Sequence, residues 1–296
     1  MLELNHEPVT LPPRAAATVA LLRDGADGLE VFLLKRHGLS DVLGGAYVFP
    51  GGKLDDGDAA PDLLARLDQS PDVLHAALAD AELSAAQAAA LHVAAVREAF
   101  EESGVLLAAA DADGGTVDTA SAMARLRAGQ DFESLVRQMA LRLATRSLVP
   151  WTRWITPRVP SVSSKRFDTR FFLATVPAGQ HAVHDERETT ESAWLTPRAA
   201  LQRYHDRLIE LAPPQIMSLA QLSRHASVAE ALHEARGRPP PVIQPEPFQN
   251  EEGLRVLCYP GDARHPLCER AMPGPTRLTF RNRRFEADGG FEALFA

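Results

Sequence analysis

Apolar residues near the start of the chain cluster in two segments that predict a β-hairpin. The segments 17–23 and 29–36 are apolar and β-prone, and the turn-rich stretch 24–28 separates them. The following stretch, 37–58, contains several glycines and Pro50, which disfavour a helix and let the backbone approach a ligand closely. We therefore expect two antiparallel strands followed by a functional loop.

The pattern then changes to helical spacing. Leucine and alanine positions across 61–81 predict short helices. Ser84 and Gln87 form a capping-box pattern, so a longer helix should begin near Ala85. This helix should end at Gly104, because glycine readily takes the left-handed conformation after a last turn.

Alternating helical and strand patterns continue through the second half of the chain. A second helical segment is expected over about 117–147, and further helices are expected up to about residue 236. Between them lie aromatic and β-branched segments that predict strands, at 151–156, 170–176 and 191–195.

Prolines predict a boundary near residue 237. The run 238–247 contains five prolines and should form an extended connection without regular ladders or helices. Beyond it, the β-prone pieces 254–259 and 276–280 predict a hairpin or small sheet.

The length of 296 residues suits one main domain with additions. Apolar residues make up 45% of the chain, enough for a substantial core. We expect a main domain over 1–236, which contains a helical insertion at about 59–88 and the second helical segment at about 117–147. A proline-rich connection and a small C-terminal extension should follow over 237–296.

The charge balance narrows the range of partners. A formal net charge of −8 argues against a nucleic acid polymer, because polyanion binding draws on clustered lysine and arginine. No apolar run approaches the roughly 20 residues that cross a bilayer, so no membrane association is expected. The sequence leaves the oligomeric state open, a homodimer included.

Two cysteines, Cys258 and Cys268, argue against a secreted protein held by disulfides, and cytoplasm is the expected location. His265 lies between them and suggests zinc. We expect two reduced thiols instead, because three ligands at this spacing match no common structural zinc site.

Three glutamates form the strongest candidate site. On a helix, Glu98, Glu101 and Glu102 stand at positions i, i+3 and i+4, so their carboxylates share one face. They repel one another, and the negative end of the helix dipole adds to the cost. A hard divalent cation such as Mg²⁺ or Mn²⁺ would compensate. The alternative is a solvated acidic face without a ligand.

The segment from Arg97 to Val105 resembles the second half of the Nudix box throughout. In the first half, Gly52 is followed by five residues and then by Asp58, at a position where the box has a glutamate. Between Asp58 and Arg97 there are 38 residues, where the usual box has seven. This departure resembles the coenzyme A diphosphatase branch of the Nudix superfamily, some members of which carry an insertion inside the box.

The resemblance covers about residues 13–235. It includes the segments 151–157 and 166–174 and the series Glu188, Glu191, Trp194 and Pro197. It implies a Nudix-type α/β/α sandwich with a mixed sheet, helical insertions and a small C-terminal extension. Trp151, Trp154 and Trp194 are expected in the core rather than stacked on a base.

The resemblance also implies roles for individual residues. Mg²⁺ or Mn²⁺ would bind the pyrophosphate oxygens and activate a water, with one of the acidic residues as general base. Arg97 is expected mainly to lock the helix to the glycine loop. The candidates are Glu98, Glu101, Arg97, Glu188 and Glu191 for catalysis, Glu98, Glu101 and Glu102 for the metal, and Lys35, Arg36, Gly51 and Gly52 for the substrate. The loop acids Glu188 and Glu191 have solvent exposure as their alternative, and the two glycines have a plain turn.

The implied activity is hydrolysis of a pyrophosphate bond in a small nucleoside diphosphate derivative, with coenzyme A or acyl-CoA leading. Lys35 and Arg36 would then pair with the 3′-phosphate of coenzyme A. Two alternatives stay open: a Nudix-fold binding or regulatory module without catalysis, and a hydrolase of ADP-ribose, NADH or dinucleoside polyphosphates.

Overall fold

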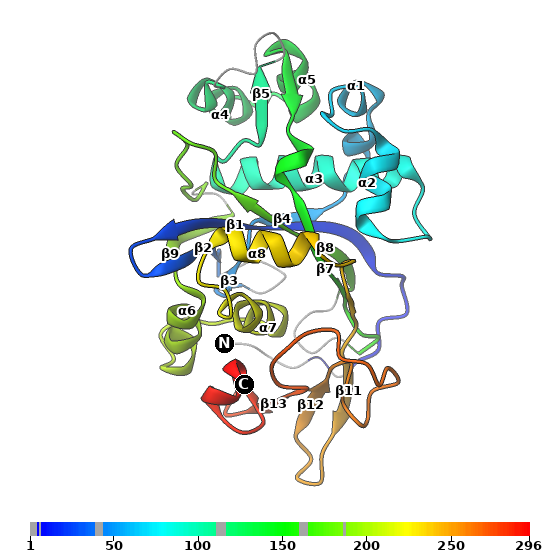
Figure 1. Cartoon of the computed structure of the whole chain (residues 1–296), viewed down its shortest axis with the longest axis vertical. Helices are drawn as coiled ribbons and strands as arrows, with labels where there is room; N and C mark the ends of the chain where they lie inside the picture. Colours follow the sequence, from blue (N-terminus) through cyan, green and yellow to red (C-terminus); the bar gives the residue numbers. More distant parts are fainter. Residues whose placement is uncertain (1–4, 6, 39–43, 111–116, 160–164, 186–187) are drawn as a thin grey trace.

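A mixed eight-stranded sheet forms the centre of the molecule, with helices on both faces (Figure 1). The computed structural model describes residues 5, 7–38, 44–110, 117–159, 165–185 and 188–296. The strands of this sheet are Arg14–Gly25 (β1), Gly28–Arg36 (β2), Tyr47–Val48 (β3), Gly51–Lys53 (β4), Val149–Ile155 (β7), Phe167–Thr175 (β8), Thr189–Leu195 (β9) and Val242–Ile243 (β10). Six of them follow the order β10-β7-β8-β1-β2-β3, while β4 pairs with β1 and β9 pairs with β2. The pairs β1/β8 and β7/β10 are parallel and the other pairs are antiparallel.

The predicted hairpin is confirmed by β1 and β2, which pair in antiparallel register with Gly25 opposite Gly28. Alternate side chains of β1 enter two different cores: Val19 and Leu21 face one helical layer, and Ala20 and Leu22 face the other. A strand that is buried on both faces has apolar residues at successive positions, as the sequence shows here.

One face of the sheet carries the helices Pro61–Leu64 (α1), Pro71–Leu78 (α2), Ala85–Ser103 (α3), Thr119–Arg127 (α4) and Phe132–Gln138 (α5) (Figure 1). The prediction for α3 is confirmed at both ends. The amide of Gln87 donates to the Ser84 hydroxyl at 3.2 Å, and the Ser84 amide donates to the Gln87 side chain at 2.8 Å. Gly104 ends the helix with a φ of 71°.

The predicted short helices of the insertion are present as α1 and α2. The insertion is tied to the sheet by Asp80, whose buried carboxylate lies 2.9 Å from Arg153 of β7 and pairs also with Arg170 of β8. It is tied to the second helical segment by Asp68, which accepts a hydrogen bond from the Thr145 hydroxyl at 2.5 Å. These contacts hold the insertion against the fold on one side of the sheet.

The helical segment predicted over about 117–147 is helical as far as α5, but the prediction is wrong for the residues after it. Residues 111–116 lie outside the described part. A strand, Leu141–Leu143 (β6), pairs with Ala108–Ala110 (β5), and a short 3₁₀ helix, Thr145–Ser147 (η2), follows. The reason is local: Ala140 takes a φ of 48°, which stops the helix, and the next residues alternate between buried leucines and the exposed Arg142. Pro150 lies inside β7, at a register irregularity.

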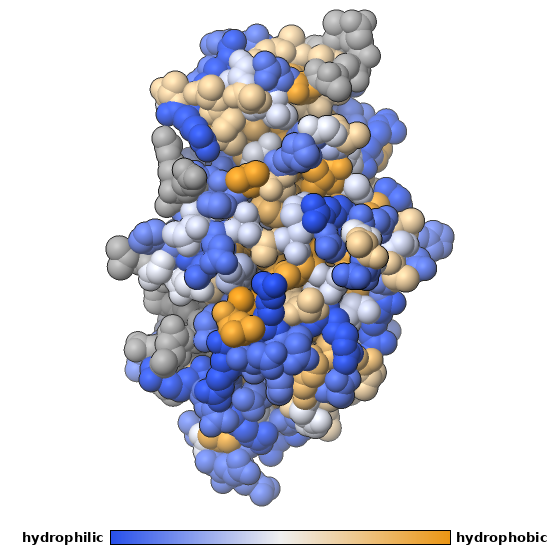
Figure 2. Space-filling model, turned by 90° about the vertical axis from the view of Figure 1, so that its left-hand side faces the viewer, coloured by the Kyte–Doolittle hydropathy of each residue, from blue (hydrophilic) through white to orange (hydrophobic). Residues whose placement is uncertain are grey.

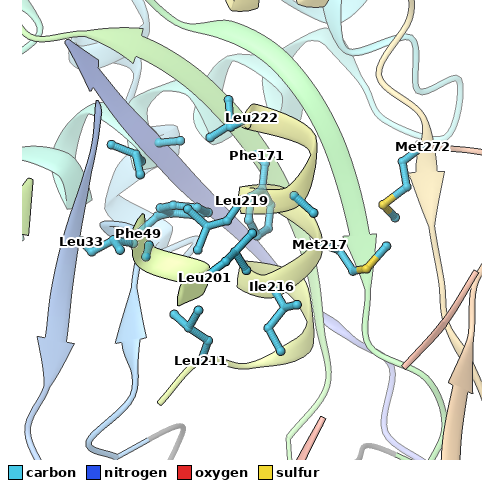
Figure 3. Packing of buried hydrophobic residues seen from close by; sticks show 14 of the residues in the cluster. Leu33, Phe49, Phe171, Leu201, Leu211, Ile216, Met217, Leu219, Leu222 and Met272 are labelled. Atoms are coloured by element: carbon cyan, nitrogen blue, oxygen red, sulfur yellow. The ribbon is translucent and has the colours of Figure 1, made fainter. Parts of the chain in front are cut away.

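The opposite face of the sheet is covered by Pro197–His205 (α6), Pro213–Leu222 (α7) and Val228–Arg236 (α8), as expected from the helical pattern up to residue 236. Figure 3 shows Ile216 and Leu219 of α7 packed near Phe49 and Phe171, and all four belong to one buried cluster. Trp151 and Trp154 are buried in the same cluster, which confirms them as core residues. Trp194 is partly buried against Phe32, with ring centroids 5.2 Å apart.

The C-terminal extension is a four-stranded antiparallel sheet with a final 3₁₀ turn, made of Glu246–Gln249 (β11), Arg255–Cys258 (β12), Arg277–Arg281 (β13), Arg284–Ala287 (β14) and Phe291–Phe295 (η3). The small sheet predicted for this region is confirmed. The prediction that the proline-rich run carries no ladder is wrong, because β10 joins the main sheet beside β7 and β11 contains Pro247. Both are edge strands, where a residue that donates no hydrogen bond is tolerated.

The extension shares its core with the main sheet. The Tyr204 hydroxyl of α6 donates to the carbonyl of Phe285 at 2.9 Å and accepts from the amide of Phe285 at 3.0 Å. Met217 and Met272 lie toward each other across the junction (Figure 3). The core therefore continues across the predicted boundary near residue 237.

The surface offers few broad apolar areas on the face seen in Figure 2, where hydrophobic residues form small separate groups among hydrophilic ones. Within the described part of the chain, no helix is long and apolar enough to cross a bilayer.

Candidate active site

The glycine loop and the last turn of α3 meet at β4. This strand pairs with β1, with Gly51 opposite Thr18, and α3 packs beside it. A Cβ on Gly52 would overlap the carboxylate of Glu98, so only glycine leaves room for that side chain. The insertion between Asp58 and Arg97 thus leaves the Gly52 backbone beside the Glu98 carboxylate.

Glu102 is the most buried carboxylate of the predicted group, with its residue 3% exposed. It accepts a hydrogen bond from the amide of Gly51 at 2.9 Å, and Arg36 lies 3.8 Å from its other oxygen. Burial, together with the charge of Glu98, raises the pKa of Glu102 to about 8. A positive charge placed here would strongly favour the ionised form.

Arg97 locks the helix to the loop, as predicted. Its guanidinium forms two hydrogen bonds to the buried Asp58, at 2.7 and 2.9 Å, and donates to the carbonyl of Lys53 at 3.1 Å. The same group donates to Glu98 at 2.8 Å and to Glu101 at 3.0 Å. Asp58 lies in a short 3₁₀ helix, Asp56–Ala59 (η1), so the aspartate that departs from the usual box pattern holds the motif together.

The other two glutamates share the effect of burial. Burial raises the pKa of Glu98 to about 7, and it also raises the pKa of Glu101, although the Arg97 charge opposes both shifts. The side chain of Glu98 is 12% exposed and that of Glu101 is 32% exposed, so the group opens toward solvent through Glu101.

The chemistry of this group fits a hard divalent cation. All donors are carboxylate oxygens, and all three carboxylates have raised pKa values that a cation would lower again. Among the described residues, no three His, Cys, Asp or Glu side chains surround a common point closely enough to hold a metal as they stand. Arg97 bonds Glu98 and Glu101 in this arrangement, so these side chains would have to turn from Arg97 toward a metal.

The carboxylates line a pocket of about 460 Å³ that extends from the glycine loop across the sheet. Its walls combine the three acids with cations, small side chains on β1 and β8, and two aromatic rings. The lining residues are Arg14, Ala16, Thr18, Arg36, Val48, Phe49, Gly51, Gly52, Lys53, Asp55, Arg97, Glu98, Glu101, Glu102, Lys165, Phe167, Thr169, Glu188 and Gln215.

Of the candidates Lys35, Arg36, Glu188 and Glu191, which lie on β2 and around β9, two line this pocket. Arg36 lines it and lies 3.9 Å from Glu188, which also lines it. Lys35 and Glu191 do not line it: they pair with each other at 3.2 Å. Successive residues of a strand point to opposite faces, so Lys35 turns away where Arg36 turns in. Hydrogen bonds from Tyr47, which has the larger effect, and from Lys35 lower the pKa of Glu191.

Several pocket residues have no counterpart among the sequence-based candidates, among them the polar residues Arg14, Lys165 and Gln215. Gln215 is 6% exposed, and its side-chain oxygen has no hydrogen-bond partner within the described part of the structure. Its position in the first turn of α7 carries no motif. Arg14 and Lys165 come together only because β1 and β8 pair across about half the chain.

The residues considered for zinc have other partners. The Cys258 thiol donates to the carbonyl of Glu246 at 3.3 Å, and Cys268 is exposed. One ring nitrogen of His265 lies 2.9 Å from the carbonyl oxygen of Gln244, and the other accepts from the amide of Leu267 at 3.0 Å.

Comparison with known proteins gives a consistent set of relatives. The family model of the NUDT19 Nudix domain matches residues 12–222. The acyl-coenzyme A diphosphatase NUDT19 of Xenopus laevis is 30% identical over 278 residues, which cover 80% of this chain and 71% of that protein. The human protein of the same name is 28% identical over 242 residues, covering 71% of this chain and 64% of its own length. A crystal structure of a Nudix hydrolase from Alicyclobacillus acidocaldarius is 28% identical with a TM-score of 0.61, covering 76% of this chain and 97% of that one. The mixed sheet between helical layers is thus an α/β Nudix fold.

Proposed function

Because this chain belongs to the Nudix family represented by the NUDT19 Nudix domain, we propose that it hydrolyses the pyrophosphate bond of coenzyme A and its acyl esters. Water adds to one phosphorus and the bridging P–O bond breaks, which gives 3′,5′-ADP and 4′-phosphopantetheine or its acyl ester. The observation that carries this proposal is the group of Glu98, Glu101 and the buried Glu102 beside the glycine loop, in a pocket that is also lined by cations.

Nudix hydrolases generally use divalent metals, and we propose Mg²⁺ or Mn²⁺ held by these three glutamates. When bound, the cation would neutralise pyrophosphate charge and make a water more acidic. Arg97 would stay bound to Asp58 when Glu98 and Glu101 turn from Arg97 toward a metal, because the two hydrogen bonds between Arg97 and Asp58 do not involve those glutamates. The arginine therefore keeps the glycine loop in place.

The remaining pocket residues would bind and orient the substrate. The Gly51 amide fixes the Glu102 side chain at 2.9 Å, and Gly52 leaves the space that Glu98 fills. Arg36 would move between Glu102 and the pyrophosphate, because its ion pairs at 3.8 and 3.9 Å are long. Among the loop acids we propose Glu188 as the general base, since it lines the pocket while Glu191 pairs with Lys35 outside it.

A substrate panel with product identification tests the proposal. Purified protein with Mg²⁺ or Mn²⁺ is offered coenzyme A, an acyl-CoA, ADP-ribose, NADH and a dinucleoside polyphosphate, and products are identified by mass. We expect coenzyme A or its acyl esters to give the highest kcat/KM, with 3′,5′-ADP as a product. Faster turnover of ADP-ribose or NADH would overturn the substrate and keep the hydrolase. Absence of turnover on every compound would favour a binding module.

A further inference from the structure

A second group of pocket residues lies where β1 and β8 begin, at the end of the pocket away from the carboxylates. The two strands are parallel, with Arg14 opposite Phe167, and the Arg14 amide donates to the carbonyl of Arg166 at 2.9 Å. Lys165 directly precedes Arg166. Parallel strands that start together place their first residues at one edge of the sheet, about 5 Å apart between neighbouring strands.

These residues line the same pocket as the carboxylates. Alternate positions of β1, namely Arg14, Ala16 and Thr18, all line the pocket, as do Phe167 and Thr169 of β8. Thr18 lies opposite Gly51, next to the carboxylates. From Thr18 to Arg14 the strand advances about 13 Å, at 3.3 Å per residue. A nucleoside with phosphates on both sides of its ribose, reached by an extended arginine side chain, would bridge that distance.

Arg14 differs from the other pocket arginines in its charge environment. Arg97 is held by Asp58, and Arg36 lies near Glu102 and Glu188. For Arg14, by contrast, no acidic partner is found within the ranges that the structure describes. Arg14 is exposed and lines the pocket, so its guanidinium can bind an anionic group of the substrate without first breaking an ion pair.

An aromatic ring next to two cations suits a phosphorylated nucleoside. Phe167 lines the pocket, where an aromatic ring can stack on a base, and arginine binds phosphate through two parallel hydrogen bonds. Of the two halves of coenzyme A, only the nucleotide half has both a planar base and a phosphate apart from the cleaved linkage.

We propose that Arg14, Lys165 and Phe167 bind the 3′-phosphoadenosine end of the substrate, with the phosphate between the two cations and the base on the ring. This subsite rests on the proposed function for the identity of its ligand. Arg14 thereby takes the specificity role that the sequence suggested for Lys35 and Arg36. Lys35 pairs with Glu191 outside the pocket, and Arg36 lies beside Glu102.

Arg14→Ala provides the test, with Lys35→Ala as the matched control. Lys35 loses the same charge from the same sheet but lies outside the pocket. For coenzyme A, Arg14→Ala should lower kcat/KM by about 10-fold or more, through KM, because one charge-assisted contact is lost. For dephospho-coenzyme A the same variant should stay within about 2-fold of wild type, and Lys35→Ala should leave both substrates within that range. Equal losses on both substrates, no loss on either, or a selective loss from Lys35→Ala would each overturn the proposal.

Direct binding separates failure of this subsite from failure of the proposed function. Calorimetry with 3′,5′-ADP and with AMP needs no turnover. Wild-type protein should bind 3′,5′-ADP more tightly than AMP, and Arg14→Ala should remove that difference. Phe167→Leu, which keeps an apolar side chain, should weaken both ligands by a similar factor of about 5 or more. If wild type binds the two nucleotides equally, the phosphate site is wrong, even when coenzyme A is hydrolysed.

Discussion

The Asp58 carboxylate is expected to be a major source of stability at the motif, and Asp58→Asn measures it. Asp58 is 1% exposed and Arg97 is 8% exposed, and they form two hydrogen bonds at 2.7 and 2.9 Å. Asp58 also accepts from the amide of Asp55 at 2.9 Å. Breaking one side of a buried ion pair costs about 3–5 kcal/mol. Because Glu98 and Glu101 still compensate the arginine, we expect about 3 kcal/mol, the lower end.

Urea unfolding followed by tryptophan fluorescence is the assay, with the free energy of unfolding extrapolated to water. Asp62→Asn is the control, since Asp62 lies nearby on α1 and, among the residues that the structure describes, forms only an exposed ion pair with Arg137 at 3.5 Å. Such surface pairs contribute about 0–1 kcal/mol. If Asp58→Asn destabilises the protein no more than Asp62→Asn does, Arg97 does not lock the motif and the reasoning fails.

Three further predictions follow from burial and packing. Since the pKa values of Glu98 and Glu102 are raised to about 7 and 8 in the folded protein, these groups favour folding below about pH 4.5 and lose that contribution as pH rises toward 8. Thermal unfolding in EDTA should therefore show a falling Tm over this window, and Mg²⁺ should raise Tm more at pH 8.5 than at pH 6; a pH-independent difference contradicts this. Gly52→Ala should lower kcat at least 10-fold by displacing Glu98, while Gly57→Ala, where a Cβ meets nothing within 4 Å, should not; equal activities refute the fit. Asp80→Asn should destabilise by about 3 kcal/mol in urea, because it leaves the buried Arg170 and the partly buried Arg153 short of a partner, and an unchanged unfolding midpoint would show that the anchor is dispensable.

Local signals made α3 and the carboxylate group predictable from sequence. The Ser84–Gln87 capping box and Gly104 fix the ends of α3, and helical spacing then sets the mutual position of Glu98, Glu101 and Glu102. The burial of Glu102 does not follow from these local signals. It depends on Gly52 being folded back against the helix after the insertion.

The substrate end of the pocket was less predictable, because it depends on strand register. Whether Lys35 or Arg36 faces the pocket is decided by which alternate side of β2 is turned toward α3, and a shift of one residue exchanges them. Arg14 and Phe167 lie 153 residues apart in number yet pair directly in parallel strands. No local pattern in either segment indicates that pairing.

The error at β6 has a similar origin. Leu141 and Leu143 have the spacing of a short strand, but three residues are too few to outweigh the helical pattern before them. Pairing with β5 and the bridge from Leu143 to Leu67 of the insertion stabilise the strand. Both are contacts between distant parts of the sequence.

The most direct test of the central claim is coenzyme A hydrolysis by Glu102→Gln at saturating Mg²⁺, measured beside wild type. Glutamine keeps the size of the buried side chain and its hydrogen bond from the Gly51 amide, and removes only the charge. We expect kcat to fall by at least about 100-fold, with circular dichroism and the urea unfolding midpoint showing a fold at least as stable as wild type. Release of 3′,5′-ADP at the wild-type rate by the folded variant would contradict the assignment of this carboxylate group as the metal site.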